Sequence, residues 1–175
     1  MKPQKIALTG ILAAILCLIS PLSLPLGAIP ISLATFAVYI AACTVDVKIS
    51  VSSVLIYILL GAAGLPVFSH FSGGFHMISG VTGGYIIGYI PCALITGLLI
   101  KRFESKKFIY PVSMILGTAV CYFTGMAWYM LQTKSNIVSA LTVCVLPFLI
   151  GDTIKISAAS AVGITLRKRL SRFIK

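Results

Sequence analysis

Long apolar segments separated by short basic runs dominate this sequence and limit the folds open to it. Six such segments lie near residues 6–20, 31–45, 49–63, 85–100, 108–131 and 147–166. A helix needs about 20 apolar residues to cross a bilayer core about 30 Å thick. Because 59% of the residues are hydrophobic and only 10% are charged, the chain carries too much apolar surface for one water-soluble core. The sequence therefore predicts an all-α integral membrane protein, a single bundle of six transmembrane helices over residues 1–175.

The distribution of the basic residues predicts the orientation of this bundle. The net charge of +11 could suggest nucleic acid as a partner, but the charges cluster between apolar segments, where membrane topology places them. With the N-terminus inside, the outer side holds Lys134 alone, and Lys155 lies within the membrane. The inner side then holds Lys2, Lys5, Lys48, Lys101, Arg102, Lys106, Lys107, Arg167, Lys168, Arg169, Arg172 and Lys175. This asymmetry predicts cytoplasmic N- and C-termini, an even number of spans and no nucleic acid partner.

The last apolar segment contains an acid and a base, Asp152 and Lys155, in the stretch PFLIGDTIK. Residues three apart share a helix face. Asp152 precedes Arg167 by 15 residues, about 22 Å of helix, which places it in the outer third of the bilayer core. Because charges at this depth are costly, we expect both side chains to face the bundle interior. Three interpretations are open: a structural ion pair, the lining of an outward-facing ligand cavity, and a proton or ion relay.

An uncharged, glycine-rich stretch, FSGGFHMISGVTGGYIIGY, runs from Phe71 to Tyr89. Irregular backbone at membrane depth is tolerated only where it is buried in protein or lines a cavity. The stretch therefore predicts a loop that folds over the outer mouth of the bundle before the next helix begins near Tyr85. It is not a phosphate-binding loop, because no Gly-Lys-Ser/Thr follows. His70 and His76 have no carboxylate or thiol near them in the sequence, so we predict no metal site.

Small residues mark one side of the first segment. Gly10 and Ala14 are four residues apart, with Ala13 adjacent, and this spacing lets membrane helices approach closely. Packing within the same bundle and docking of a partner protein are both open.

Sequence motifs for catalysis are missing. No Walker motif, HExxH, GxSxG or pair of catalytic carboxylates occurs, and Asp46, Glu104 and Asp152 are the only acids. We therefore expect no enzyme, no ATPase activity of the chain's own and no cofactor.

Four stretches together resemble the BioY family, the biotin-specific substrate-binding subunits (S components) of energy-coupling-factor (ECF) transporters. They are PLGAIPISLATF (25–36), YILLGAAGLPVFSHFSGG (57–74), GVTGGYIIGY (80–89) and LPFLIGDTIK (146–155). The resemblance implies a multi-pass protein of the bacterial plasma membrane, in contact with membrane lipid, that captures biotin from outside and carries it inward. It also implies docking, through Gly10, Ala13 and Ala14, onto a transmembrane coupling protein and two ATPase subunits.

The resemblance also implies site residues. Asp152 and Lys155 match the Gly-Asp-x-x-Lys of the family, whereas Gly83, Gly84 and Tyr85 match its Thr-Gly-Gly-Tyr.

The sequence departs from the family at four positions, and these departures concern the outer loops. Val81 replaces a common proline, Ala34 replaces a common glutamine, and His70 and Phe71 replace small residues.

The chemistry of biotin suits these residues. We expect Asp152 to accept hydrogen bonds from the ureido N–H groups and Lys155 to pair with the valerate carboxylate. In the alternative, the two side chains mainly pair with each other and orient the site. Phe75, Tyr85 and Tyr89 would wall the apolar part of the ligand, with Gly74 in the adjoining loop. An S component for another small vitamin and a structural or enzymatic membrane bundle are the competing functions.

Overall fold

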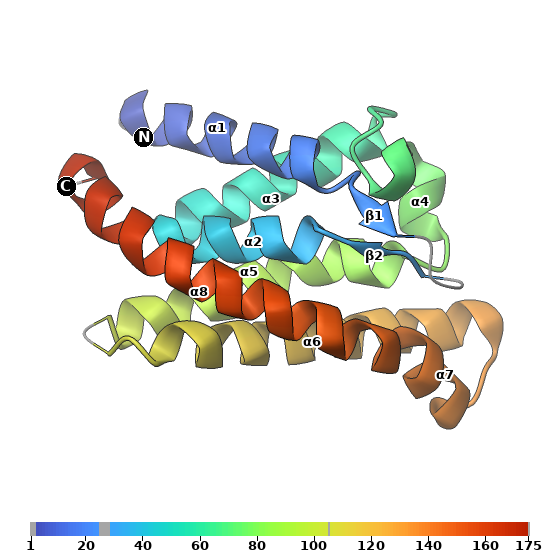
Figure 1. Cartoon of the computed structure of the whole chain (residues 1–175). Helices are drawn as coiled ribbons and strands as arrows, with labels where there is room; N and C mark the ends of the chain where they lie inside the picture. Colours follow the sequence, from blue (N-terminus) through green and yellow to red (C-terminus); the bar gives the residue numbers. More distant parts are fainter. Residues whose placement is uncertain (1–2, 25–28, 105, 175) are drawn as a thin grey trace.

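The computed structural model describes residues 3–24, 29–104 and 106–174, with side chains described as far as Leu170. Figure 1 shows an elongated bundle of helices in which the N- and C-termini lie at the same end. The bundle helices are α1 (Pro3–Ile19), α2 (Ala34–Thr44), α3 (Val47–Ala62), α5 (Gly83–Arg102), α6 (Ile109–Thr133) and α8 (Leu146–Ile174). The predicted all-helical membrane bundle is confirmed, and the predicted segments match these helices to within a few residues, except at the end of α8.

The charge pattern divides the bundle into two ends. α1 and α3 begin, and α5 and α8 end, at the end that holds the termini (Figure 1), so their basic residues gather there. Lys134, the C-cap residue of α6, belongs to the opposite end. We call these the inner and outer ends, as the positive-inside pattern predicts. Lys2 and Lys175 of the predicted inner set lie outside the described residues.

The helices differ in length, and this matters for the site. Gly83–Arg102, Ile109–Thr133 and Ile137–Leu170 are each apolar and long enough to cross a membrane. α1, α2 and α3 are apolar but have only 17, 11 and 16 residues. An 11-residue helix rises about 16 Å, roughly half of the bilayer core. The chain ahead of α2 therefore has to cover the remaining depth at the outer end.

The proline-rich stretch after α1 forms a small hairpin. As predicted, the first helix ends there, because proline lacks the backbone N–H and its ring clashes with the carbonyl of the preceding turn. Strands β1 (Ser23–Leu24) and β2 (Ile31–Ser32) then pair antiparallel, with Ser23 opposite Ser32. The sequence did not predict these strands, and residues 25–28 between them lie outside the described part.

The glycine-rich stretch lies at the outer end beside this hairpin (Figure 1). It contains a 3₁₀ turn (Ser69–Phe71) and a short helix, α4 (Phe75–Ser79), so the predicted loop is partly helical. His70 and Phe71 have positive φ angles of 58° and 54°. The His70 N–H donates to the Pro21 carbonyl at 3.1 Å, which ties the two outer segments together.

At the inner end, α8 continues through the basic tail to Ile174, beyond the predicted end at Leu166. Arg167 is therefore not at the end of the helix. Its Nε donates to Glu104 at 2.7 Å, and its Nη1 donates to the carbonyls of Cys43 and Val45 at 3.3 and 3.4 Å. These carbonyls belong to the C-terminal end of α2, where a cation is favourable.

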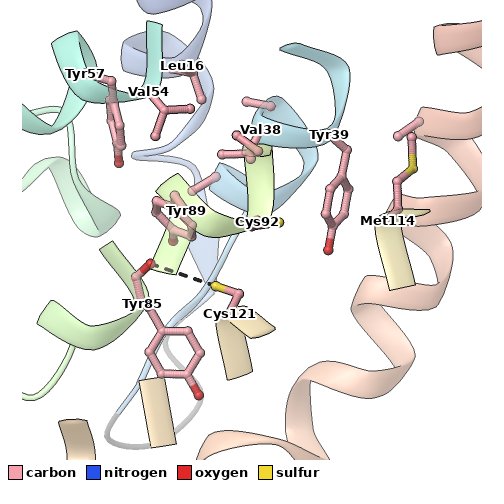
Figure 2. Close-up of a cluster of buried hydrophobic side chains, with 14 of the residues drawn as sticks. Leu16, Val38, Tyr39, Val54, Tyr57, Tyr85, Tyr89, Cys92, Met114 and Cys121 are labelled. Atoms are coloured by element: carbon pink, nitrogen blue, oxygen red, sulfur yellow. Dashed lines mark hydrogen bonds between the residues drawn. The ribbon is translucent and has the colours of Figure 1, made fainter. Parts of the chain in front are cut away.

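The core lies between the bundle helices and is shown in Figure 2, with Tyr57 from α3 and Tyr85 and Tyr89 from α5. The hydroxyls of Tyr39 and Thr118 bond to each other and link α2 to α6. Glycines let α5 and α6 approach closely: a Cβ on Gly84 would lie 2.3 Å from the Cβ of Trp128.

Candidate ligand-binding site

A cavity of about 40 Å³ lies at the outer end of the bundle, beneath the hairpin, the 3₁₀ turn and α4. Six of its sixteen described lining residues are aromatic, and four polar residues form a bonded group beside them. The aromatic wall consists of Tyr57, Phe68, Tyr85, Tyr89, Tyr122 and Phe148. The bonded polar group consists of Ser32, Thr35, Asp152 and Lys155, and Ser69 and Thr82 also line the cavity. A few convergent polar groups in an aromatic cavity are typical of a small-molecule site.

The helical period of α8 turns its acid and base toward this cavity. The buried positions of α8 around them are 152, 155, 156, 159 and 160, which follow the i, i+3, i+4 spacing of one helix face. Asp152 is 3% exposed and Lys155 is 7% exposed. The predicted inward orientation of both side chains is thus what the structure shows.

Lys155 has a protein partner for each of its three ammonium protons. Its Nζ donates to Asp152 Oδ1 at 2.9 Å, to the carbonyl of Ser32 at 2.7 Å and to Thr35 Oγ1 at 3.2 Å. The ammonium therefore holds β2 and the start of α2 against α8.

Both carboxylate oxygens of Asp152 are also bonded. Besides the bond from Lys155, Oδ1 accepts from the hydroxyl of Thr35 at 3.3 Å, and Oδ2 accepts from the hydroxyl of Tyr122 at 2.5 Å. A buried ion pair is costly when its remaining lone pairs and protons lack partners, and here they are supplied from three other elements. The pair thus has a fixed position and still lines the cavity.

The aromatic wall is held by its own contacts. The rings of Tyr85 and Phe148 stack with centroids 5.8 Å apart, and the Tyr85 hydroxyl donates to the carbonyl of Cys144. Across the cavity, Tyr57 and Phe68 meet edge to face at 5.5 Å. Such pairs add stability beyond the area that they bury. The wall is therefore a packed, apolar surface with polar groups at its edge.

The predicted site residues divide into two groups. Asp152, Lys155, Tyr85 and Tyr89 come together on the cavity.

The other four predicted residues lie away from the lining. Gly83 and Gly84 pack against neighbouring segments, since a Cβ on Gly83 would lie 1.7 Å from the carbonyl oxygen of Ile78. Gly74 precedes α4 with φ +104°, a conformation that favours glycine. The Phe75 side chain is 70% exposed. Direct ligand contact by these four residues stays a prediction.

The small residues of α1 also divide. Ala13 is buried inside the bundle, whereas Gly10 and Ala14 are exposed. Among the described residues, a Cβ on Gly10 would meet nothing within 4 Å, so packing against this part of the chain does not explain the glycine.

Several residues of the cavity were not predicted from the sequence. Ser32 and Thr35 lie in the stretch PLGAIPISLATF, which the resemblance had already marked, so a signal for them existed. Phe148 likewise lies in the marked stretch LPFLIGDTIK. Tyr122 had no signal, because an aromatic residue in an apolar helix is usually a core or lipid contact.

A helical membrane bundle with an aromatic cavity and a buried acid–base pair at its outer end defines a solute-binding, multi-pass membrane protein. Comparison with known proteins gives the particular family. A sequence model of the BioY family matches residues 1–172. The chain belongs to the BioY family.

Individual relatives and a solved structure agree with this assignment. The chain is 35% identical to the biotin transporter BioY of Thermotoga maritima, with 91% of this chain and 93% of that protein covered. It is 34% identical to a probable biotin transporter BioY of Pyrococcus horikoshii, with 95% and 97% covered. The fold superimposes with a TM-score of 0.89 on the crystal structure of the S component for biotin from an ECF-type ABC transporter, at 24% identity, over 95% of this chain and 92% of that one.

Proposed function

We propose that this protein is the biotin-binding S component of an ECF transporter, which captures biotin at the outer face and carries it inward with a partner ATPase module. The observation that carries the proposal is the buried Asp152–Lys155 pair on an aromatic cavity, in a chain of the BioY family. The Thermotoga maritima relative is named a biotin transporter, and the Pyrococcus horikoshii relative a probable one. The protein acts as a transport subunit and not as an enzyme.

The hydrogen bonds of the pair indicate how biotin would be held. A carboxylate has about four lone-pair sites. Asp152 uses three of them, for Lys155, Thr35 and Tyr122, which leaves one for a ureido N–H of the ligand. Lys155 donates to three protein acceptors already, so a ligand carboxylate would replace one of them. Asp152 can accept from the ligand, and Lys155 can donate to it, while the two side chains keep their 2.9 Å contact.

The size of the cavity bears on how the ligand enters. A volume of about 40 Å³ has room for a few water molecules, and a bicyclic vitamin needs several times more. For biotin to bind, the lining side chains rearrange or the cover of the cavity moves. The glycine-rich segment between α3 and α5 is our candidate, because Phe68, Ser69 and Met77 of this segment line the cavity from the outer end.

The exposed side of α1 is the proposed docking face for a transmembrane coupling protein, which in turn engages two ATPase subunits. Gly10 and Ala14 present a small, open surface there, and small residues let two membrane helices approach closely. Ala13 is buried and supports the helix from inside.

Equilibrium binding of biotin to the purified protein in detergent tests the proposal. We expect tight binding by the wild type and a loss of at least tenfold in Asp152→Asn and Lys155→Met, since hydrogen bonds to charged groups contribute about 1.5–3 kcal/mol. Asp46→Asn and Lys134→Met make the same changes away from the cavity and should bind like the wild type.

Two results would overturn the proposal, and they differ in meaning. If the wild type ignores biotin and binds another compound in a vitamin panel, the ligand is wrong. If folded Asp152→Asn and Lys155→Met bind biotin as the wild type does, the pair is structural and the site lies elsewhere.

A further inference from the structure

A second hollow lies at the inner end of the bundle, between α1, α3 and α5. It is a groove of about 630 Å³, and none of its described lining residues also lines the outer cavity. Its rim carries the ammonium groups of Lys5, Lys48 and Lys101, and Val51 and Leu94 form part of its floor. We propose that this groove binds an anionic phospholipid of the inner leaflet.

The positions of the groove residues along their helices fit a phospholipid. Lys5, Lys48 and Lys101 lie within the first or last turn of their helices, which is the level of lipid headgroups. Leu94 lies seven residues before Lys101, about 10 Å deeper in the bilayer. A phosphate among the three ammonium groups would thus place an acyl chain along Leu94. A soluble anion such as phosphate has no apolar part that could contact this floor.

The charges of the groove also favour an anion. Among the described residues, no carboxylate lies within ion-pair distance of Lys5, Lys48 or Lys101, and this includes Asp46 on the same rim. The Asp46 side chain makes no capping bond to α3, so the positive N-terminal end of that helix adds to the field. Three cations against one acid leave the groove positive. Basic pockets between helices on the cytoplasmic side are suited to anionic headgroups.

The groove is separate from the proposed docking face on α1. Lys5 and Gly10 are five residues apart, which turns them about 140° around the helix. A coupling protein on the side of Gly10 and Ala14 would leave the groove to lipid. Because the groove and the outer cavity share no described lining residue, the inference does not depend on the ligand of the outer cavity.

The test is binding of phosphatidylglycerol to the purified full-length protein, measured by native mass spectrometry and by retention after delipidation. We expect one tightly held phosphatidylglycerol in the wild type. Lys48→Gln/Lys101→Gln should weaken it about 25-fold, roughly fivefold for each lysine near the surface. Asp46→Asn should strengthen it. The matched control, Lys106→Gln/Lys107→Gln, removes two exposed charges of the same end outside the groove and should bind like the wild type.

Comparison ligands separate lipid from other anions. Phosphatidylcholine, which has no net charge, and inorganic phosphate alone should each fail to displace the bound phosphatidylglycerol. The proposal is overturned if the groove variant and the control bind the lipid equally, if phosphatidylcholine binds as tightly, or if inorganic phosphate competes. It is also overturned if the groove variant keeps its lipid but no longer assembles with the ATPase module, because the lysines would then contact a protein.

Discussion

Tyr122 completes the bonding of the buried carboxylate from a helix that the charged pair does not belong to. Its hydroxyl donates to Asp152 Oδ2 at 2.5 Å, while the other oxygen is held by Lys155 and Thr35. The same ring lies 6.3 Å from that of Phe148 in the cavity wall. One residue therefore orients the acid and shapes the apolar part of the site.

The variant Tyr122→Phe separates these two roles, because it keeps the ring and removes the hydroxyl. An acceptor left without its partner costs about 1–3 kcal/mol, so we expect a lower unfolding temperature and about tenfold weaker biotin binding. Thermal unfolding and equilibrium binding in detergent measure the two effects. Tyr129→Phe makes the same change on α6 at a hydroxyl that has no bond to the described residues, and it should leave both values unchanged. Equal behaviour of the two variants would contradict this role of Tyr122.

Single residues could be predicted where the membrane makes their position costly. Asp152 and Lys155 had to face the interior, because a charge cannot face lipid at that depth, and both do. Thr35 and Tyr122 carry no such constraint, since a threonine hydroxyl in an apolar helix can bond to its own backbone and a tyrosine can face either the bundle or the lipid. Their meeting at Asp152 depends on the packing of three helices, which one sequence does not reveal.

At the scale of elements, α2 is held to α8 at both of its ends. At the outer end, Lys155 and Asp152 bond to Ser32 and Thr35, and at the inner end Arg167 bonds to the last carbonyls of α2. A helix this short has few bonds of its own, so these contacts from α8 fix its position. Contacts with α8 therefore fix the position of Thr35, the residue of α2 that lines the cavity.

The α5–α6 pair depends on glycine in a different way. The resemblance predicts a ligand role for Gly83 and Gly84, which stays a prediction, and the structure shows close packing at both: Gly83 against Ile78 of α4 and Gly84 against Trp128 of α6. The same residue pattern serves both purposes, because a missing side chain lets either a ligand or another backbone approach. Helix positions were predictable from apolar length, but this contact was not.

Alanine at Gly84 tests the packing role. Its Cβ would lie 2.3 Å from Trp128 Cβ and 2.7 Å from the carbonyl oxygen of Thr124, so the helices must separate. Overpacking of this kind costs about 1–3 kcal/mol, and we expect a clearly lower unfolding temperature in detergent. Gly10→Ala is the control, since its Cβ would meet no atom of the described residues within 4 Å, and it replaces glycine by a better helix former. Its unfolding temperature should be equal or higher. A Gly84→Ala variant as stable as the wild type would contradict close packing.

At the scale of the whole molecule, the ligand cavity and the proposed docking face lie on different parts of the bundle. The cavity lies at the outer end, whereas the basic ends of the helices and both termini lie at the inner end (Figure 1). α1 and α6 lie on opposite sides of the bundle in the same view. A partner on α1 would therefore leave the outer cavity and α6 uncovered, and biotin capture and docking should be separable by mutation.

The matched variants Ala14→Leu and Ala119→Leu test this separation. Both enlarge an exposed alanine, on α1 and on α6 respectively. Because a leucine between two closely packed helices forces them apart, Ala14→Leu should strongly reduce co-purification with the coupling protein and ATPase subunits. Ala119→Leu should assemble normally, since lipid accommodates the larger side chain. Both should bind biotin like the wild type when purified alone. Normal assembly of Ala14→Leu and Gly10→Leu would move the docking face to another helix, whereas lost biotin binding in either would show that α1 shapes the cavity instead.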